Sequence, residues 1–212
     1  MNKLLIILCF LLSLTGCVQA PQSIQTKTPQ IKEYSVSSHE TWQEVGLSPE
    51  EIKFLTQLQK EVQADNQHID YNEYLTNPPT DNKGQFWYQC AVILSTLPEN
   101  QQLDIRPNGK LFRALGILDE MLKYNSKFPQ IWAQKIIVLN YLAHGYWSSA
   151  SALNMVQGQE EKAEEHRRAT VSLGRALLET AEEAAKMYPK DEWFQDELEH
   201  IRENFGSFAE KQ

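Results

Sequence analysis

Apolar residues recur every three or four positions through most of this 212-residue chain, and that spacing fixes the class of fold. Leu173, Leu177 and Ala181 show the pattern, which places an apolar stripe along one side of a helix. No run alternates polar and apolar residues for long enough to form a sheet. We therefore expect an all-α domain, made either of stacked antiparallel helical hairpins or of a simple helical bundle.

Prolines and turn residues divide this pattern into helices. Ser48-Pro49-Glu50-Glu51 has the residues of a capping box with proline in the first turn, and predicts a helix start. Gln85 to Leu97 predicts an apolar helix, with a buried strand as the alternative. Ser148 to Ser151 is a stretch of small residues that separates two predicted helices, with a turn near Gly158. The positions expected to face the core are Ile52, Leu55, Leu58, Val62, Leu111, Leu115, Leu118, Leu122, Trp132, Ile136, Leu139, Ala143, Tyr146, His166, Thr170, Leu173, Leu177, Ala181, Ala184, Tyr188, Phe194, Leu198, Ile201, Phe205 and Phe208.

The N-terminus has the pattern of an export signal. Lys3 is followed by an apolar run, Leu4 to Leu12, that is shorter than the roughly 20 residues needed to cross a bilayer. Leu14-Thr15-Gly16-Cys17 follows directly, and it resembles the lipobox of bacterial lipoproteins. The resemblance implies cleavage between Gly16 and Cys17 and attachment of fatty acyl chains to Cys17. An ordinary secretory signal with a chance cysteine is the alternative.

The order of segments predicts a tethered domain. Residues 1–16 form the signal peptide, and residues 17–41, rich in Gln, Thr, Ser and Pro, predict an acylated cysteine and a disordered spacer. Residues 42–98 and 109–212 predict two helical regions on either side of a loop. By analogy with other lipoproteins, Val18 after the cysteine favours the outer membrane over the inner one. The net charge of −8 argues against binding to nucleic acid.

The second helical region resembles tetratricopeptide repeats. Tyr124 to Pro129 with Trp132, and Lys186 to Pro189 with Trp193, share the layout of a helix end followed by the next helix. Ala184 precedes Pro189 at the position where that family has a small residue. The two prolines are 60 residues apart, which is not a multiple of the family's period of about 34. The resemblance implies helical hairpins that stack and form a groove for a peptide or a partner helix.

Motifs for metal or catalytic chemistry are sparse. Glu197-Leu198-Glu199-His200 contains one Glu-x-x-His, which on a helix is typical of a solvated face. Asp65 to Tyr74 resembles the second half of an EF-hand, but Val62, Ala64 and Gln67 replace two ligands and the turn glycine. We predict no metal site, no cofactor and no catalytic residue.

Three further features have ordinary interpretations. Cys90, in an apolar run, predicts a buried thiol, with a reactive or intermolecular thiol as the alternative. His166 lies on an apolar stripe and predicts a partly buried packing residue. The acidic runs at Glu160-Glu161, Glu164-Glu165 and Glu182-Glu183 predict solvated helix faces, and a basic partner is the alternative.

Together these features predict a lipid-anchored, periplasm-facing lipoprotein, attached to the bilayer through Cys17. Its helical domain would bind a protein partner, as a scaffold or accessory factor in an envelope assembly. The alternative is an envelope enzyme or small-ligand-binding protein that uses a pocket between helices with converging polar groups.

Overall fold

The computed structural model describes residues 39–64, 68–79, 84–97 and 103–209, and these residues form helices without any strand. The all-α prediction is therefore confirmed for the described part of the chain. The elements are α2 (His39–Glu44), α3 (Pro49–Gln63), α4 (Tyr71–Tyr74), α5 (Gln85–Ser95), α6 (Lys110–Asn125), α7 (Pro129–Leu153), α8 (Glu160–Met187) and α9 (Glu192–Ala209).

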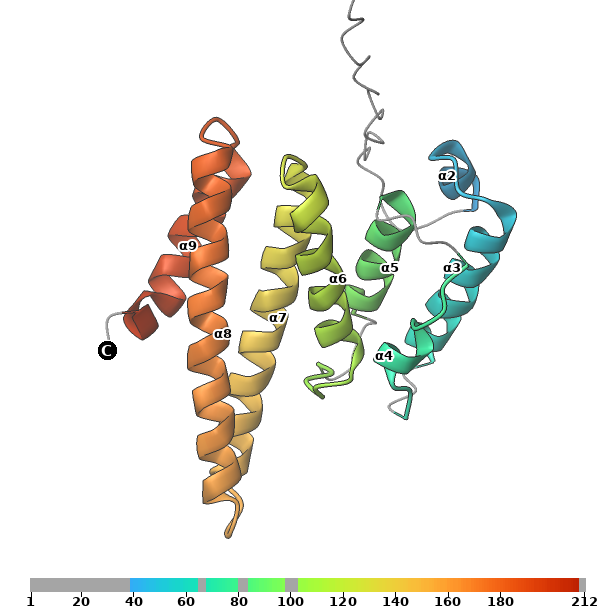
Figure 1. Ribbon diagram of the computed structural model, residues 1–212. Coiled ribbons are helices and arrows are strands. Elements are labelled where there is room, and N and C mark those ends of the chain that lie inside the picture. The colour runs from blue at the N-terminus through green and yellow to red at the C-terminus, as the bar shows by residue number, and fades with distance from the viewer. Residues whose placement is uncertain (1–38, 65–67, 80–83, 98–102, 210–212) are drawn as a thin grey trace, which may run out of the picture.

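The long helices stand in an open row that follows their order in the chain (Figure 1). α3 packs on α5, α5 on α6, α6 on α7, α7 on α8, and α8 on α9. The α7–α8 pair is the most extensive of these interfaces. Among the described residues, α3 and α9 lie at opposite ends of the row (Figure 1), so the helices do not close into a ring.

Helix α7 separates two hydrophobic cores. Ile131, Val138 and Leu142 face the first core, which extends from Trp42 in α2 through α3, α5 and α6. The other side of α7 meets α8 and α9 in the second core. Three leucines are partly buried against both cores, so the two are in contact at their edges: Leu115, Leu122 and Leu173. The α7 residues of the second core are Trp132, Ile136, Leu139 and Ala143.

Most of the predicted core positions are buried. The apolar stripe of α3 is buried throughout, from Ile52 to Val62, and the α9 stripe is buried at Phe194, Leu198, Ile201 and Phe205. In α6, Leu111 and Leu118 are fully buried, whereas Leu115 and Leu122 are only partly covered. The side chain of Phe208 lies outside the described residues.

Local chemistry explains where helices begin. The predicted capping box of α3 is present, because the Ser48 hydroxyl accepts from the backbone N–H of Glu51 at 3.2 Å and the Glu51 carboxylate accepts from Ser48 N–H at 2.7 Å. Gln85 to Ser95 forms a helix, as predicted, so the alternative of a buried strand is wrong. Asp70 caps α4 by accepting from the backbone N–H groups of Asn72 and Glu73.

Two boundaries differ from the sequence prediction. α2 begins at His39, within the segment predicted as spacer. α7 does not end at the small residues Ser148 to Ser151 but continues to Leu153. Ala150 is buried there, although it lies within the stretch of small residues. The turn near Gly158 is confirmed, since that residue has a positive φ of 82°.

The two junctions that resemble each other in sequence meet in space. The indole N–H of Trp132 donates to the carbonyl of Ser126 at 2.7 Å, and the Tyr188 hydroxyl donates to the same carbonyl at 3.3 Å. Since Ser126 follows α6 and Tyr188 ends α8, this carbonyl joins the α6–α7 turn to the α8–α9 turn.

Candidate functional site

The predicted lipidation site lies outside the described residues. Gly16 and Cys17, the proposed cleavage and acylation positions, therefore stay predictions from sequence, as do the signal peptide and the spacer up to residue 38. Within the described residues, no helix has the length and apolar character needed to span a membrane.

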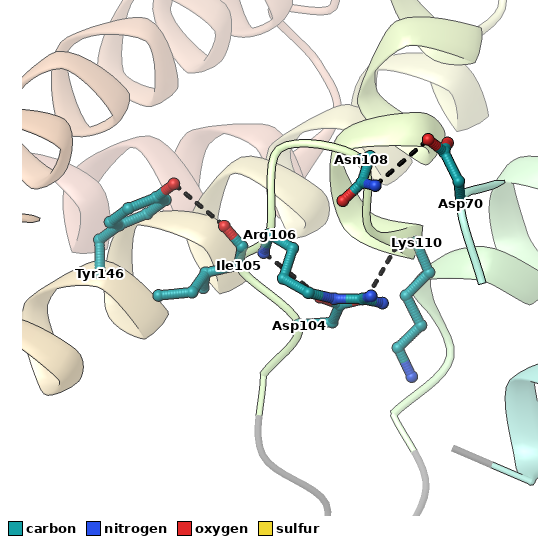
Figure 2. Close-up of polar contacts among 7 residues, drawn as sticks. All are labelled: Asp70, Asp104, Ile105, Arg106, Asn108, Lys110 and Tyr146. Atoms are coloured by element: carbon teal, nitrogen blue, oxygen red, sulfur yellow. Dashed lines mark hydrogen bonds and ion pairs between the residues drawn. The ribbon is translucent and has the colours of Figure 1, made fainter. Parts of the chain in front are cut away.

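In the segment that resembles part of an EF-hand, Asp70 accepts hydrogen bonds from other groups of the protein. Asp70 caps α4, and its second oxygen accepts from the side-chain amide of Asn108 at 3.2 Å (Figure 2). Those hydrogen bonds lower the pKa of Asp70, the one from Asn108 most. Asp65 and Gln67 lie outside the described residues. Asp70 thus connects α4 to the loop before α6.

The other motif residues are dispersed. His200 is exposed on α9, beside Asn204, and Glu197 is half-buried. His166 is partly buried as predicted, with its ring nitrogen 2.9 Å from the Ser149 hydroxyl. Across the described ranges, no group of three or more metal-binding side chains comes together.

The acidic runs and Cys90 behave as their ordinary interpretations predict. The six glutamates of the runs are exposed, and Glu164 and Glu182 form ion pairs with Arg167 and Arg202. Cys90 is fully buried. Burial raises the pKa of its thiol, which disfavours the reactive thiolate.

The loop at residues 103–109 contains a cluster of polar contacts (Figure 2). The Asp104 carboxylate accepts from the Arg106 Nε at 2.8 Å, from the Arg106 Nη2 at 2.9 Å and from the backbone N–H of Lys110 at 3.1 Å. The last bond caps α6, which begins at Lys110. Burial alone would raise the pKa of Asp104, but these hydrogen bonds outweigh it and lower that pKa.

The same loop is fastened to both of its neighbours. The Tyr146 hydroxyl of α7 donates to the carbonyl of Ile105 at 3.0 Å (Figure 2), and the backbone N–H of Tyr71 donates to Asn108 at 3.1 Å. A Cβ at Gly145 would lie 2.5 Å from the Ile105 side chain, so only glycine allows this approach. The loop is a structural clamp between α4, α6 and α7.

A groove around Trp147 is the first of two sites suited to binding. Trp147 of α7 is 58% exposed and forms a wall shared by two hollows. One hollow, of about 250 Å³, lies between α7 and α8, and the other, of about 230 Å³, extends to the end of α9. Thr170 of α8 lines both hollows, so they form one groove. The remaining lining residues are Ala150, Ser151, Asn154, Arg167 and Val171 in the first hollow, and His144, Asn204 and Phe205 in the second.

The α7–α8 hairpin extends beyond this groove. In Figure 1 its lower end projects past the other helices. Near the tip, Met155 is 83% exposed and Val156 is 52% exposed. Large exposed apolar side chains gathered at one place mark surfaces for interaction more often than they occur on inert faces.

A cleft between α5 and α6 is the second site. Its volume is about 270 Å³, and its walls include Trp87 of α5 and Arg113 of α6. The alternative function predicted from sequence requires a pocket between helices with converging polar groups. This cleft is a pocket between helices, and the sequence did not single out either residue.

A wider and shallower hollow lies on the outer face of α2 and α3. It measures about 750 Å³ and is lined by Lys53 and Lys60 together with Leu47 and Ile52. Most of the surface that this hollow exposes is apolar, and the two lysines place positive charge beside it.

Comparison of the chain with protein-family models, with curated proteins and with solved structures finds no match.

Proposed function

We propose that this chain is a lipid-anchored, periplasm-facing lipoprotein whose helical domain binds a protein partner through the groove around Trp147. It would serve as a scaffold or accessory factor in an envelope assembly. The anchor is inferred from Leu14-Thr15-Gly16-Cys17, and placement at the outer membrane from Val18. The partner-binding role is supported chiefly by the exposure of Trp147 between two adjoining hollows.

The shape of the groove favours an amphipathic helix as the bound segment. On α7 its wall is formed by residues spaced three and four apart, namely Trp147, Ala150, Ser151 and Asn154. The small, exposed side chain of Ser151 permits close approach of another helix, and Trp147 supplies a large apolar contact. Phe205 lines the same groove from the end of α9, so a bound helix would continue the line of α9 along α8.

The test is site-specific photo-crosslinking in cells. A photoreactive residue in place of Trp147 should crosslink to one protein, and the crosslinked partner peptide should be a predicted amphipathic helix. The matched control is the same substitution at Trp193, which is 41% exposed but lies at the start of α9, away from the groove. Equal crosslinking from both positions, or none from position 147, would reject the groove as the binding surface.

A binding measurement then gives the magnitude. With the captured partner, Trp147→Ala should weaken binding at least about tenfold, because exposed tryptophans in grooves are common hot spots. Trp193→Ala should change affinity less than about threefold.

The anchor has its own test. Labelling with a radioactive fatty acid should mark the wild-type chain and should vanish in Cys17→Ser, which lacks the acylated thiol. Persistent labelling of Cys17→Ser would refute acylation at this residue without affecting the groove.

A further inference from the structure

Five residues of α6 line the α5–α6 cleft on one face of the helix. They are spaced three, one, three and one apart, so they form a continuous stripe across the cleft from Trp87. Trp87 is almost fully buried. The α6 residues are Arg113, Gly116, Ile117, Glu120 and Met121.

Arg113 has a charge that the described residues do not balance. Its Nε is buried and makes no hydrogen bond, and its guanidinium forms no ion pair with any described residue. By contrast, Arg106, Arg167 and Arg202 each contact a carboxylate. Arg113 is half-buried, and this partial desolvation of its charge lowers its pKa. A desolvated cation without a partner is costly, unless an anion binds beside it.

Glu120, the one acid among the described residues that line the cleft, is paired with a lysine. Glu120 lies two turns along α6 from Arg113, roughly 10 Å away along the helix axis. Its carboxylate accepts from the Lys123 ammonium at 2.7 Å. Glu120 therefore places negative charge at the far end of the cleft, and the Arg113 end is left for an anion.

Gly116 keeps the cleft open between these two ends. It lies in the middle of α6, where glycine costs about 1 kcal/mol relative to alanine. A Cβ at this position would meet nothing within 4 Å, so packing does not require glycine. A side chain there would, however, project into the mouth of the cleft that Gly116 lines.

We propose that the α5–α6 cleft binds a small apolar carboxylic acid, with its carboxylate on the Arg113 guanidinium and its body against the exposed edge of Trp87. A planar carboxylate matches the guanidinium fork. Contact with Trp87 favours an organic acid over inorganic phosphate, whereas Ile117 and Met121 line the floor of the cleft and are almost fully buried. The volume of about 270 Å³ is near the lower limit of small-molecule sites, which favours a single ring or a short chain. This inference uses none of the residues of the Trp147 groove and does not depend on the proposed function.

The experiment is a titration of the full-length, ¹⁵N-labelled protein in detergent, followed by NMR. The probes are benzoate, phenylacetate and hexanoate, with benzamide as the uncharged match for benzoate and inorganic phosphate as the match without an apolar body. At least one acid should shift the Trp87 indole N–H and the Arg113 Nε–H resonances in a saturable manner. Benzamide and phosphate should bind at least about tenfold more weakly.

Variants separate a ligand-binding role from a structural one. Arg113→Gln should reduce affinity for the best acid at least about tenfold, and Arg113→Lys should reduce it less. Gly116→Ala should raise the melting temperature while weakening binding, a combination that a merely structural role does not produce. Arg202→Gln, which removes an exposed and paired arginine on α9, is the matched control and should bind as wild type does.

Several outcomes would overturn the proposal. The absence of saturable shifts with all three acids would do so, as would equal binding of benzoate and benzamide. Tighter binding of phosphate than of any organic acid would replace an apolar acid with a simple anion site. If Arg113→Gln does not fold, Arg113→Lys and Gly116→Ala decide the question: unchanged affinity in both would reject the site.

Discussion

Asp104 is the residue on which the loop before α6 depends. Its carboxylate is 10% exposed and accepts from Arg106 and from the first residue of α6. We expect Asp104→Asn to lower the free energy of unfolding by about 1.5–3 kcal/mol, because charge-assisted hydrogen bonds and a helix cap are lost together. Urea unfolding measures this. Asp119→Asn, which removes an exposed partner of Lys135, should cost less than about 1 kcal/mol.

The same carboxylate predicts how stability responds to acid. The folded state lowers the pKa of Asp104 below the value of about 3.9 typical of unfolded chains. Its contribution is therefore fully present above that value and is lost as the pH falls through the folded-state pKa. Between pH 5 and pH 2, the wild type should lose more stability than Asp104→Asn does. Parallel pH profiles for the two proteins would contradict this assignment.

Three glycines inside helices predict opposite responses to the same substitution. Gly145→Ala should destabilise the protein by about 1–3 kcal/mol, because the new Cβ would lie 2.5 Å from Ile105. Gly116→Ala and Gly206→Ala should be neutral or stabilising by up to about 1 kcal/mol, since nothing lies within 4 Å. Thermal melts of the three variants test this, and a Gly145→Ala variant as stable as the other two would mean that α7 does not approach the loop so closely.

For single residues, the sequence predicted which side chains are buried better than it predicted which ones line a pocket or hold the loop before α6. Cys90 and the apolar stripes follow from spacing within one helix. Trp87 and Arg113 do not, because they are on different helices and meet only when α5 packs on α6. Trp147 stands next to a run of small residues that predicted a helix end, so its exposure on a continuing helix was missed. Asp104 was not singled out either, since an acid in a loop ordinarily faces solvent.

At the scale of the helix, α8 offers a graded test of its apolar stripe. Leu177 is fully buried in the second core, whereas Leu173 is partly buried at the edge of both cores. Leu177→Ala should cost about 2–5 kcal/mol in the free energy of unfolding. Leu173→Ala should cost less, about 1–2 kcal/mol, because part of its side chain is already in water. Equal costs in chemical denaturation would show that the stripe is rotated from the position described.

The helices themselves could be predicted where one face is apolar and the other polar. α3 has that pattern and a capping box, and its start and its apolar core residues were both predicted. α7 is apolar on two sides, so the sequence revealed the stripe with Trp132 and Ile136 but did not separate the opposite one with Val138 and Leu142. The sequence did not predict α2. Trp42 is its only described side chain that is buried, and a single apolar residue does not define a helical period.

For the whole molecule, the projecting hairpin predicts uneven stability. In the span from 131 to 143, α7 is covered on both sides by the two cores, whereas the end of α7 and the start of α8 have few buried side chains. Backbone amides at residues 147–165 should exchange with solvent at least about a hundredfold faster than those at 131–143. Hydrogen exchange followed by mass spectrometry measures this. Uniform protection along α7 would contradict the prediction.

The spacing of apolar residues could not predict that the helices form an open row. Stacked hairpins and a closed bundle need the same stripes, and they differ only in whether the first and last helices meet. That depends on crossing angles set by packing at each interface, such as that between α7 and α8, and no pattern within one helix encodes it.

The position of α7 between two cores restricts how this chain can change in length. Each residue of a helix turns by about 100° relative to the one before. An insertion of one residue near Leu139 would therefore rotate everything downstream away from both of its packing partners at once. Length variation among descendants of this sequence should then accumulate at the Gly158 turn, where a longer hairpin would extend the projecting end and leave both sets of contacts in register.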